Sequence, residues 1–357
     1  MSRDLVVAPW GDGIAGALLD DGWLLDWVSV PADGAVQPGA IHLARVAQTR
    51  PELGLAFVAL EGGAEASLEL GAEPPRQGDT LLVQIAAAAR AGKPARASAR
   101  PALAGQYVVL RHGTPALRLP ATMGEDEAER FGALRDTVPE GLSASLRSAA
   151  SGADPECVRE ELVALAQLWI RISRDAEARR APSLLHAPAA AMRAAMPLLR
   201  ARPRRVLAAD RRILHALATG RVEATCADAP GAALFDQHDV ATQLASAETA
   251  VVLLTDGGSL SVETTRALTA IDVDGGSDGD AGRVNRGAVR EIARQVRLRD
   301  LRGTIVVDFL RTGEASRRVV ADALAAAVAI DRRRVGLLGW TRGGLYEMRR
   351  SDELDDR

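Results

Sequence analysis

The alternation of hydrophobic and polar residues predicts a β-hairpin near the start of the chain. Ile14–Leu19 and Trp23–Val30 are mainly apolar runs, and Asp20-Asp21-Gly22 between them is a strong turn signal. Further short apolar segments follow, each bounded by turn residues. Their spacing is typical of a small five-stranded barrel of the OB-fold type. The predicted strands are Ala40–Val46, Leu55–Leu60, Ala66–Leu70, Thr80–Ile85 and Ala95–Ala99.

Later segments have the period of amphipathic helices. Pro155–Arg174 places Leu162, Leu165, Trp169 and Ile172 on one face, and Asn285–Asp300 and Ala315–Arg332 have similar apolar faces. The helix over Asn285–Asp300 separates two apolar runs, Ala267–Val273 and Thr304–Leu310. Strand, helix and strand form a βαβ unit, so the two strands are expected to be parallel.

Each of these two predicted strands carries an aspartate among apolar neighbours. Asp272 lies between Ile271 and Val273, and Asp308 follows Val307. Parallel pairing could bring the two carboxylates side by side. A buried ionised carboxylate costs several kcal/mol unless it is paired or binds a metal. Two interpretations remain open: each aspartate caps a turn or pairs with an arginine, or the two hold Mg²⁺ or Mn²⁺ through oxygen ligands.

Composition limits the function classes without selecting one. The chain has 357 residues and a formal net charge of −3, so it lacks the overall basicity typical of nucleic-acid-binding proteins. Its arginine clusters, at Arg179–Arg180, Arg200–Arg205, Arg286–Arg302 and Arg332–Arg334, are most simply interpreted as solvated helix faces. Two separated cysteines argue against a zinc site. The N-terminal sequence does not resemble a signal peptide, and no apolar run is long enough for a membrane span, so we expect a cytoplasmic protein with no membrane partner.

The most specific motif surrounds the aspartates. TTRALTAIDVDGG followed by EIARQVRLRDLRGTIVVDFL resembles the catalytic core of the ribonuclease E/G family of bacterial endoribonucleases. The resemblance implies that Asp272, Asp274 and Asp308 hold Mg²⁺, with Mn²⁺ possible, and that Asp272 and Asp308 are catalytic. The family usually has Asn where this chain has Asp274. The loop Gly275–Val284 is shorter than usual in the family.

The same resemblance implies an α/β fold with several subdomains. Residues 1–36 and 181–255 would form an RNase-H-like subdomain, interrupted by an OB-fold RNA-binding barrel over 37–104 and a 5′-sensor-like region over 105–180. A DNase-I-like catalytic subdomain would follow over 256–350, and residues 351–357 would be a disordered acidic tail.

Two binding sites follow from the resemblance. Phe57 would stack on RNA, with Lys93 and Arg96 contacting its backbone; the alternative for Phe57 is a core aromatic of the barrel. Arg147 and Ser148 would grip a 5′-phosphate with support from Arg342, because a guanidinium and a hydroxyl together suit a terminal phosphate. The alternative is a strand–turn in which Arg147 is exposed and Ser148 caps the turn.

The resemblance therefore implies a Mg²⁺-dependent endoribonuclease that cleaves single-stranded RNA and leaves 5′-phosphate and 3′-hydroxyl ends. The alternative is a weakly active or inactive RNA-binding relative, since aromatic residues are only 3% of the chain. Members of the family carry a CPxC motif that links subunits through zinc. This sequence has no such motif, so neither a bound zinc ion nor a zinc-linked dimer or tetramer is expected.

Overall fold

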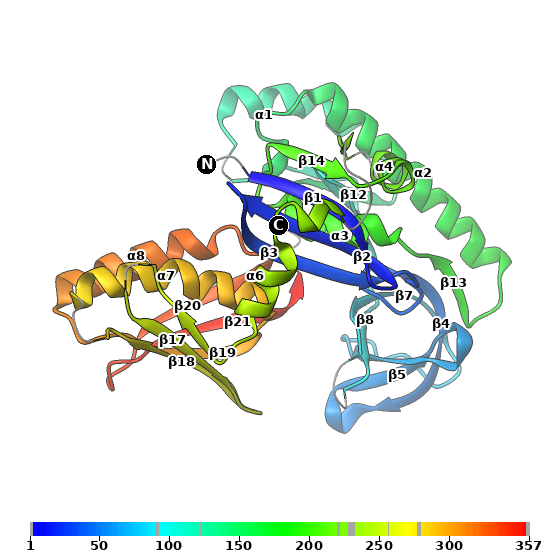
Figure 1. Ribbon diagram of the computed structural model, residues 1–357. Coiled ribbons are helices and arrows are strands. Elements are labelled where there is room, and N and C mark those ends of the chain that lie inside the picture. The colour runs from blue at the N-terminus through cyan, green and yellow to red at the C-terminus, as the bar shows by residue number, and fades with distance from the viewer. Residues whose placement is uncertain are drawn as a thin grey trace.

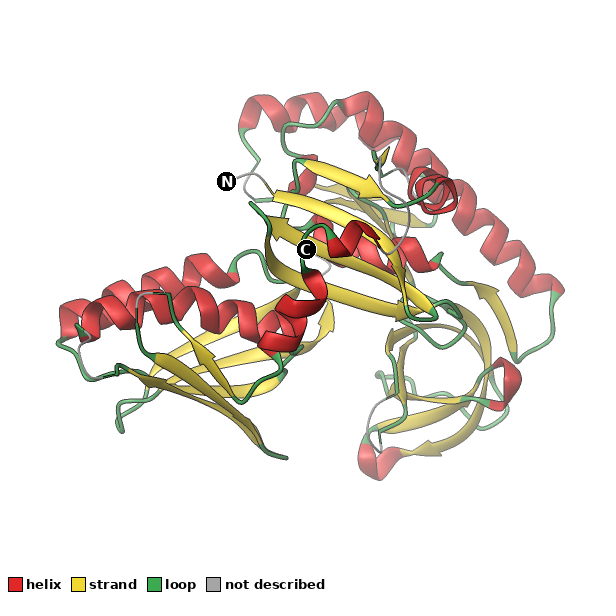
Figure 2. Ribbon diagram, viewed as in Figure 1, coloured by secondary structure: helices red, strands yellow, loops and turns green. Residues whose placement is uncertain are grey.

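The computed structural model describes residues 3–89, 93–121, 123–219, 222–227, 233–255, 257–276 and 280–354. These residues form four β-sheets with helices packed between and beside them (Figures 1 and 2). The mixed α/β character is therefore confirmed. None of the described helices combines the length and apolar character that a bilayer-spanning helix requires.

The first sheet combines the N-terminal strands with two strands from residues 205–226. The predicted hairpin is confirmed, with Asp21 and Gly22 at positive φ in its turn (49° and 86°). Strands from much later in the chain extend this sheet in parallel to β1. Its strands, in spatial order, are β15 (Thr225–Cys226), β14 (Arg205–Ala208), β1 (Arg3–Trp10), β2 (Gly13–Asp20) and β3 (Trp23–Pro31). Four helices occur between residues 190 and 247: α3 (Ala190–Leu199), α4 (Arg211–Thr219), α5 (Ala233–Asp236) and α6 (Val240–Ala247).

The predicted OB-like barrel is confirmed as a closed five-stranded sheet. Strand β7 pairs with both β8 and β4, which closes the ring. Inward-facing residues such as Ala56, Val58 and Val83 fill the interior. The barrel strands are β4 (Ile41–Arg50), β5 (Leu55–Ala59), β6 (Glu65–Glu69), β7 (Thr80–Ala87) and β8 (Ala95–Ser98), and β13 (Ser183–His186) adds to the edge of β4. Short 3₁₀ turns, Pro51–Leu53 and Glu61–Gly63, connect them.

A smaller third sheet packs against a long helix. Helix α2 (Pro155–Ala178) begins at Asp154, whose side chain accepts a hydrogen bond from Glu156 N, and it buries Leu162, Trp169 and Ile172 as predicted. The sheet has the order β11 (Ala116–Arg118), β12 (Leu142–Leu146), β10 (Val108–His112) and β9 (Ala102–Ala104). Helix α1 (Glu125–Gly132) and the 3₁₀ turns Ala133–Thr137 and Ser148–Ala150 complete this region.

The last sheet contains the predicted βαβ unit. Strands β18 and β19 are parallel and are joined by α7, as expected. Helices α7 and α8 cover one face of the sheet, and no described helix covers the other (Figure 1). The elements are β16 (Val251–Leu253), β17 (Ser259–Thr264), β18 (Leu268–Asp274), α7 (Ala281–Leu298), β19 (Gly303–Asp308), α8 (Glu314–Val328), β20 (Arg333–Trp340) and β21 (Tyr346–Leu354).

The end of the chain differs from the sequence prediction. Strand β21 pairs with both β19 and β20, so residues 351–354 continue a strand and are not a disordered tail. The acidic end of this segment obscured the strand pattern in the sequence. Its earlier residues Tyr346, Met348 and Arg350 alternate with more exposed ones and point into the core. Residues 355–357 lie outside the described part.

The interpretation of the arginine clusters as solvated faces holds for Arg179–Arg180 but is wrong near the C-terminal sheet. Five arginines there are nine-tenths or more buried: Arg294, Arg297, Arg332, Arg333 and Arg350. Arg294 Nε and Arg297 Nε on α7 donate to the carbonyls of Leu24 (2.6 Å) and Leu25 (3.0 Å) on β3. These contacts dock the N-terminal sheet onto the C-terminal sheet's helices.

Three aspartates pair with the buried arginines Arg332, Arg333 and Arg350. Arg350 donates to Asp331 (2.9 Å) and to Asp300 (2.9 Å), and Arg332 pairs with Asp26 of β3. Burial alone would raise the pKa of Asp300, but Arg332, Arg302, Arg333 and Arg350 outweigh it and hold that pKa well below its usual range. The stabilisation from ionised Asp300 is present above its ordinary pKa of about 3.9 and is lost as the pH falls below that value.

We predict that Asp331→Ala lowers the free energy of unfolding by about 3 kcal/mol or more, because it removes the carboxylate that accepts three hydrogen bonds from the fully buried Arg350. The exposed pair Arg318–Glu314 provides the matched control, and Glu314→Ala should change stability little. Denaturant unfolding of both variants measures the difference. Equal stabilities would contradict a structural role for the buried cluster.

Candidate active site

The structure brings Asp272 and Asp308 together as predicted. The two residues are register partners in the parallel β18–β19 ladder. Neighbouring strands lie about 4.8 Å apart, so the two backbones are separated by that distance at this position. Both side chains point away from their buried neighbours, such as Ile271, Val273 and Val307, and therefore share the face that no described helix covers.

The surroundings of these aspartates differ from the sequence prediction. We expected carboxylates inside buried strands, but Asp272, Asp274 and Asp308 are all exposed, because only one face of the sheet is packed. Within the described part of the chain, the side chains of Asp272 and Asp308 form no hydrogen bond and no ion pair. The alternative in which arginines neutralise these two residues is therefore not what the structure shows.

Asp274 has a local role as well. Its Oδ1 accepts a hydrogen bond from Gly276 N (2.9 Å), which forms a turn at the end of β18. Gly258 allows this end to lie close to β17: it has φ +84°, and a Cβ there would lie 2.2 Å from the Asp274 carbonyl oxygen. Asp274 therefore caps a turn, as one of the two interpretations predicted, and its Oδ2 is not used in that bond.

The donor set fits a hard divalent cation through two carboxylates. The described residues contain no group of three or more His, Cys, Asp or Glu side chains arranged to hold a metal. Mg²⁺ keeps several waters and is commonly bound by one or two carboxylates together with substrate phosphates. Two unpaired, adjacent carboxylates on an open face meet that requirement.

The barrel places two predicted RNA-binding residues in one outer row. Phe57 pairs with Ser67, which pairs in turn with Arg96 on the next strand. Ala56 and Val58 point inward, so Phe57 lies half-buried on the outer surface and is not the core aromatic of the alternative interpretation. Lys93 is exposed just before β8.

Arg147 and Ser148 lie where β12 ends. Arg147 Nη1 donates to the Gly105 carbonyl (2.9 Å), and Arg202 donates to the Ser148 carbonyl. Arg147 is half-buried rather than exposed. Nearby, burial raises the pKa of Glu161 to about 7, against three backbone N–H groups and Arg147, which favour its ionised form.

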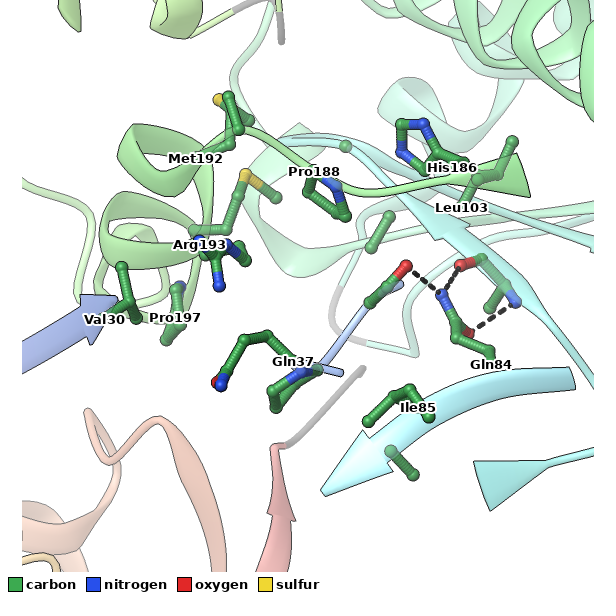
Figure 3. A pocket seen from close by; sticks show the side chains of 18 of the residues that line it. Val30, Gln37, Gln84, Ile85, Leu103, His186, Pro188, Met192, Arg193 and Pro197 are labelled. Carbon is green, nitrogen blue, oxygen red and sulfur yellow. Dashed lines mark hydrogen bonds between the residues drawn. The ribbon is translucent and has the colours of Figure 1, made fainter. Parts of the chain in front are cut away.

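A large cavity of about 1370 Å³ opens beside Arg147, where the barrel, α2, α3 and the C-terminal sheet converge. Figure 3 shows part of its wall, including Arg193 beside apolar residues such as Met192 and Pro197. The described lining contains nine arginines and only four acidic residues, although the chain as a whole carries a net charge of −3. Sequence reasoning missed this basic lining, because its arginines come from distant segments.

Arg342 does not join Arg147 and Ser148. It is exposed on the turn between β20 and β21, at the same edge of the sheet as Asp308. The cavity meets this sheet at Arg333, at the opposite end of β20. The seven residue-to-residue steps along β20 span about 23 Å at roughly 3.3 Å each, so the structure separates Arg342 from the other two predicted phosphate ligands.

Comparisons with known proteins identify the family of this chain. A sequence model of the Ribonuclease E/G family matches residues 102–353. Ribonuclease E of Escherichia coli K12 is 31% identical over 98% of the chain, and Ribonuclease G of Salmonella typhimurium is 28% identical over 77%. The chain spans 37% and 60% of the lengths of these two relatives. A family match over most of the chain, together with the aspartate-bearing strands, shows that this protein belongs to the ribonuclease E/G family.

Proposed function

We propose that this protein is a Mg²⁺-dependent endoribonuclease that cleaves single-stranded RNA and leaves 5′-phosphate and 3′-hydroxyl ends. One observation carries the proposal: Asp272 and Asp308 are unpaired register partners on an open sheet face. Family membership supports the same activity, since the matched relatives are named Ribonuclease E and Ribonuclease G.

Asp272 and Asp308 would hold the cation, with Mn²⁺ as a possible substitute. When bound, the ion would activate water and stabilise the charge that develops on the scissile phosphate. The uncovered face leaves the carboxylates accessible to an extended RNA strand. Asp274 would add negative charge at the end of β18 while its Oδ1 keeps the turn bond to Gly276.

The barrel would hold the RNA on its outer surface. Phe57 offers a half-exposed ring for stacking, and Arg96 lies two strands away in the same row. Lys93 would add charge near the start of β8. This arrangement joins one stacking platform to a cationic strip, as single-strand-binding barrels do.

The proposed function includes an assignment of subdomains along the chain. Strands β3, β2, β1, β14 and β15 lie in that order, with β14 and β15 parallel to β1, and this supports an RNase-H-like subdomain over 1–36 and 181–255. The barrel at 37–104, the sensor-like region at 105–180 and the DNase-I-like catalytic subdomain from 256 would complete the chain.

Arg147 and Ser148 would bind a 5′-phosphate at the mouth of the basic cavity. The excess of arginine in the lining supports an anionic occupant at this position. Arg342 is not included in this site.

We predict that Asp272→Asn abolishes cleavage of a fluorogenic single-stranded RNA at every Mg²⁺ concentration. Asp274→Asn, the matched control, should keep cleavage, because an amide oxygen can still accept from Gly276 N, but should need roughly two- to tenfold more Mg²⁺. Mg²⁺ titrations with an EDTA arm measure both. Cleavage by the unaltered protein in EDTA would contradict the metal proposal, and no cleavage at any Mg²⁺ would favour the inactive RNA-binding relative.

We predict that Phe57→Ala weakens binding to a single-stranded RNA oligomer about tenfold or more, because base stacking on an aromatic ring contributes about 1–3 kcal/mol. Leu53→Ala removes another exposed apolar side chain of the same barrel, 63% exposed, and should leave affinity unchanged. Fluorescence anisotropy compares the two. Equal affinities would remove Phe57 from the RNA surface.

We predict that RNA with a 5′-monophosphate is cut faster than the same RNA with a 5′-hydroxyl, and that Arg147→Ala erases the difference. Arg342→Ala should preserve it, because Arg342 lies at the other end of the last sheet. Paired cleavage assays on both RNAs provide the measurement. Loss of the preference in Arg342→Ala alone would refute this placement of the sensor.

A further inference from the structure

A buried asparagine interrupts the apolar face of α7 near the proposed metal site. Asn285 has no exposed surface, although its neighbours on this face, such as Val284, Ala288 and Val289, are apolar core residues. A buried amide costs free energy unless its polar atoms are hydrogen-bonded. Its partners therefore indicate what the residue does.

Both polar atoms of the Asn285 side chain bind the backbone of one residue. Nδ2 donates to the Leu310 carbonyl (2.8 Å), and Oδ1 accepts from Leu310 N (3.1 Å). Leu310 lies two residues after Asp308, just beyond the end of β19. Asn285 thus holds the backbone of Leu310, in the segment that directly follows Asp308.

Leu310 also contacts the segment that follows the other strand. A Cβ at Gly275 would lie 2.9 Å from Leu310 Cδ1, so the Leu310 side chain packs directly against the backbone of residue 275. Gly275 directly follows Asp274. Asp274 lies two positions after Asp272 and therefore on the same sheet face. The ends of β18 and β19, which carry the proposed ligands, therefore meet at Leu310.

We propose that Asn285 is a positioning residue that sets the spacing of the Asp272 and Asp308 carboxylates and thereby the affinity for the divalent cation. The inference rests on the proposed function. Asn285 does not touch the ion; it acts through the backbone of Leu310. Partners that orient metal ligands typically change metal affinity about 10- to 100-fold when they are removed.

The chain offers a matched control on the same helix. Gln295 is also fully buried, and its amide donates to Glu291 Oε1 (2.7 Å) and accepts from Arg299 Nε (2.7 Å). It lies ten residues further along α7, about 15 Å from Asn285 at 1.5 Å per residue. Gln295→Ala therefore removes a buried, doubly bonded amide without touching Leu310.

The experiment measures Mn²⁺ binding by electron paramagnetic resonance and the Mg²⁺ dependence of RNA cleavage, using the full chain at a temperature where all variants are folded. The variants are Asn285→Ala, Gln295→Ala and Asp308→Asn. We expect Asn285→Ala to weaken Mn²⁺ binding about tenfold or more and to raise the half-maximal Mg²⁺ by a similar factor. Gln295→Ala should leave both unchanged even if its melting temperature falls.

The outcomes separate this inference from the proposed function. If the unaltered protein binds Mn²⁺ and Asp308→Asn does not, but Asn285→Ala binds as tightly as Gln295→Ala, the positioning role is wrong and the metal site stands. If the unaltered protein binds no Mn²⁺ and cleaves no RNA, both proposals are overturned. Should Asn285→Ala fail to fold, Asn285→Asp, which retains the acceptor and loses the donor, is expected to weaken Mn²⁺ binding, and unchanged binding in that variant would overturn the inference.

Discussion

The buried pairing of arginine with aspartate between the first and last sheets is the constraint on which the rest of the structure depends. Arg350, Asp331 and Asp300 form its centre, and Arg332 extends it to Asp26 on β3. Breaking one partner would leave a charge stranded in the interior, which is far more costly than losing an exposed ion pair. The cluster therefore holds the last sheet against β3 of the first sheet, although the two segments lie at opposite ends of the chain.

This docking determines which surfaces remain available for chemistry. Helix α7 binds the N-terminal sheet through Arg294 and Arg297 while its apolar side covers the last sheet. One face of that sheet is thereby filled, and the other carries Asp272 and Asp308 in the open. The same convergence of sheets surrounds the basic cavity beside Arg147, at the end of the last sheet opposite the aspartates.

Charge is divided between these places according to solvent access. Buried arginines have polar partners, because an unsatisfied guanidinium in the interior is costly: Arg332 and Arg350 pair with aspartates, and Arg297 donates to backbone carbonyls. The proposed ligands are unpaired, because exposed carboxylates are stable in water without a partner. A cation and an RNA phosphate can therefore reach Asp272 and Asp308 without first breaking an ion pair, which is the condition that the proposed activity requires.

The sequence by itself determined the elements and the central pairing. Periods of two and of 3.6 residues specified the hairpin, the barrel strands and α2, and the short βαβ unit left parallel pairing of the Asp272 and Asp308 strands as the expected solution. Only the tertiary structure decided which arginines are buried and that Tyr346–Leu354 forms a further strand, β21. It also decided that Phe57 faces outward and that Arg342 lies far from Arg147. Local patterns cannot fix these features, because desolvation and proximity depend on partners that are distant in sequence.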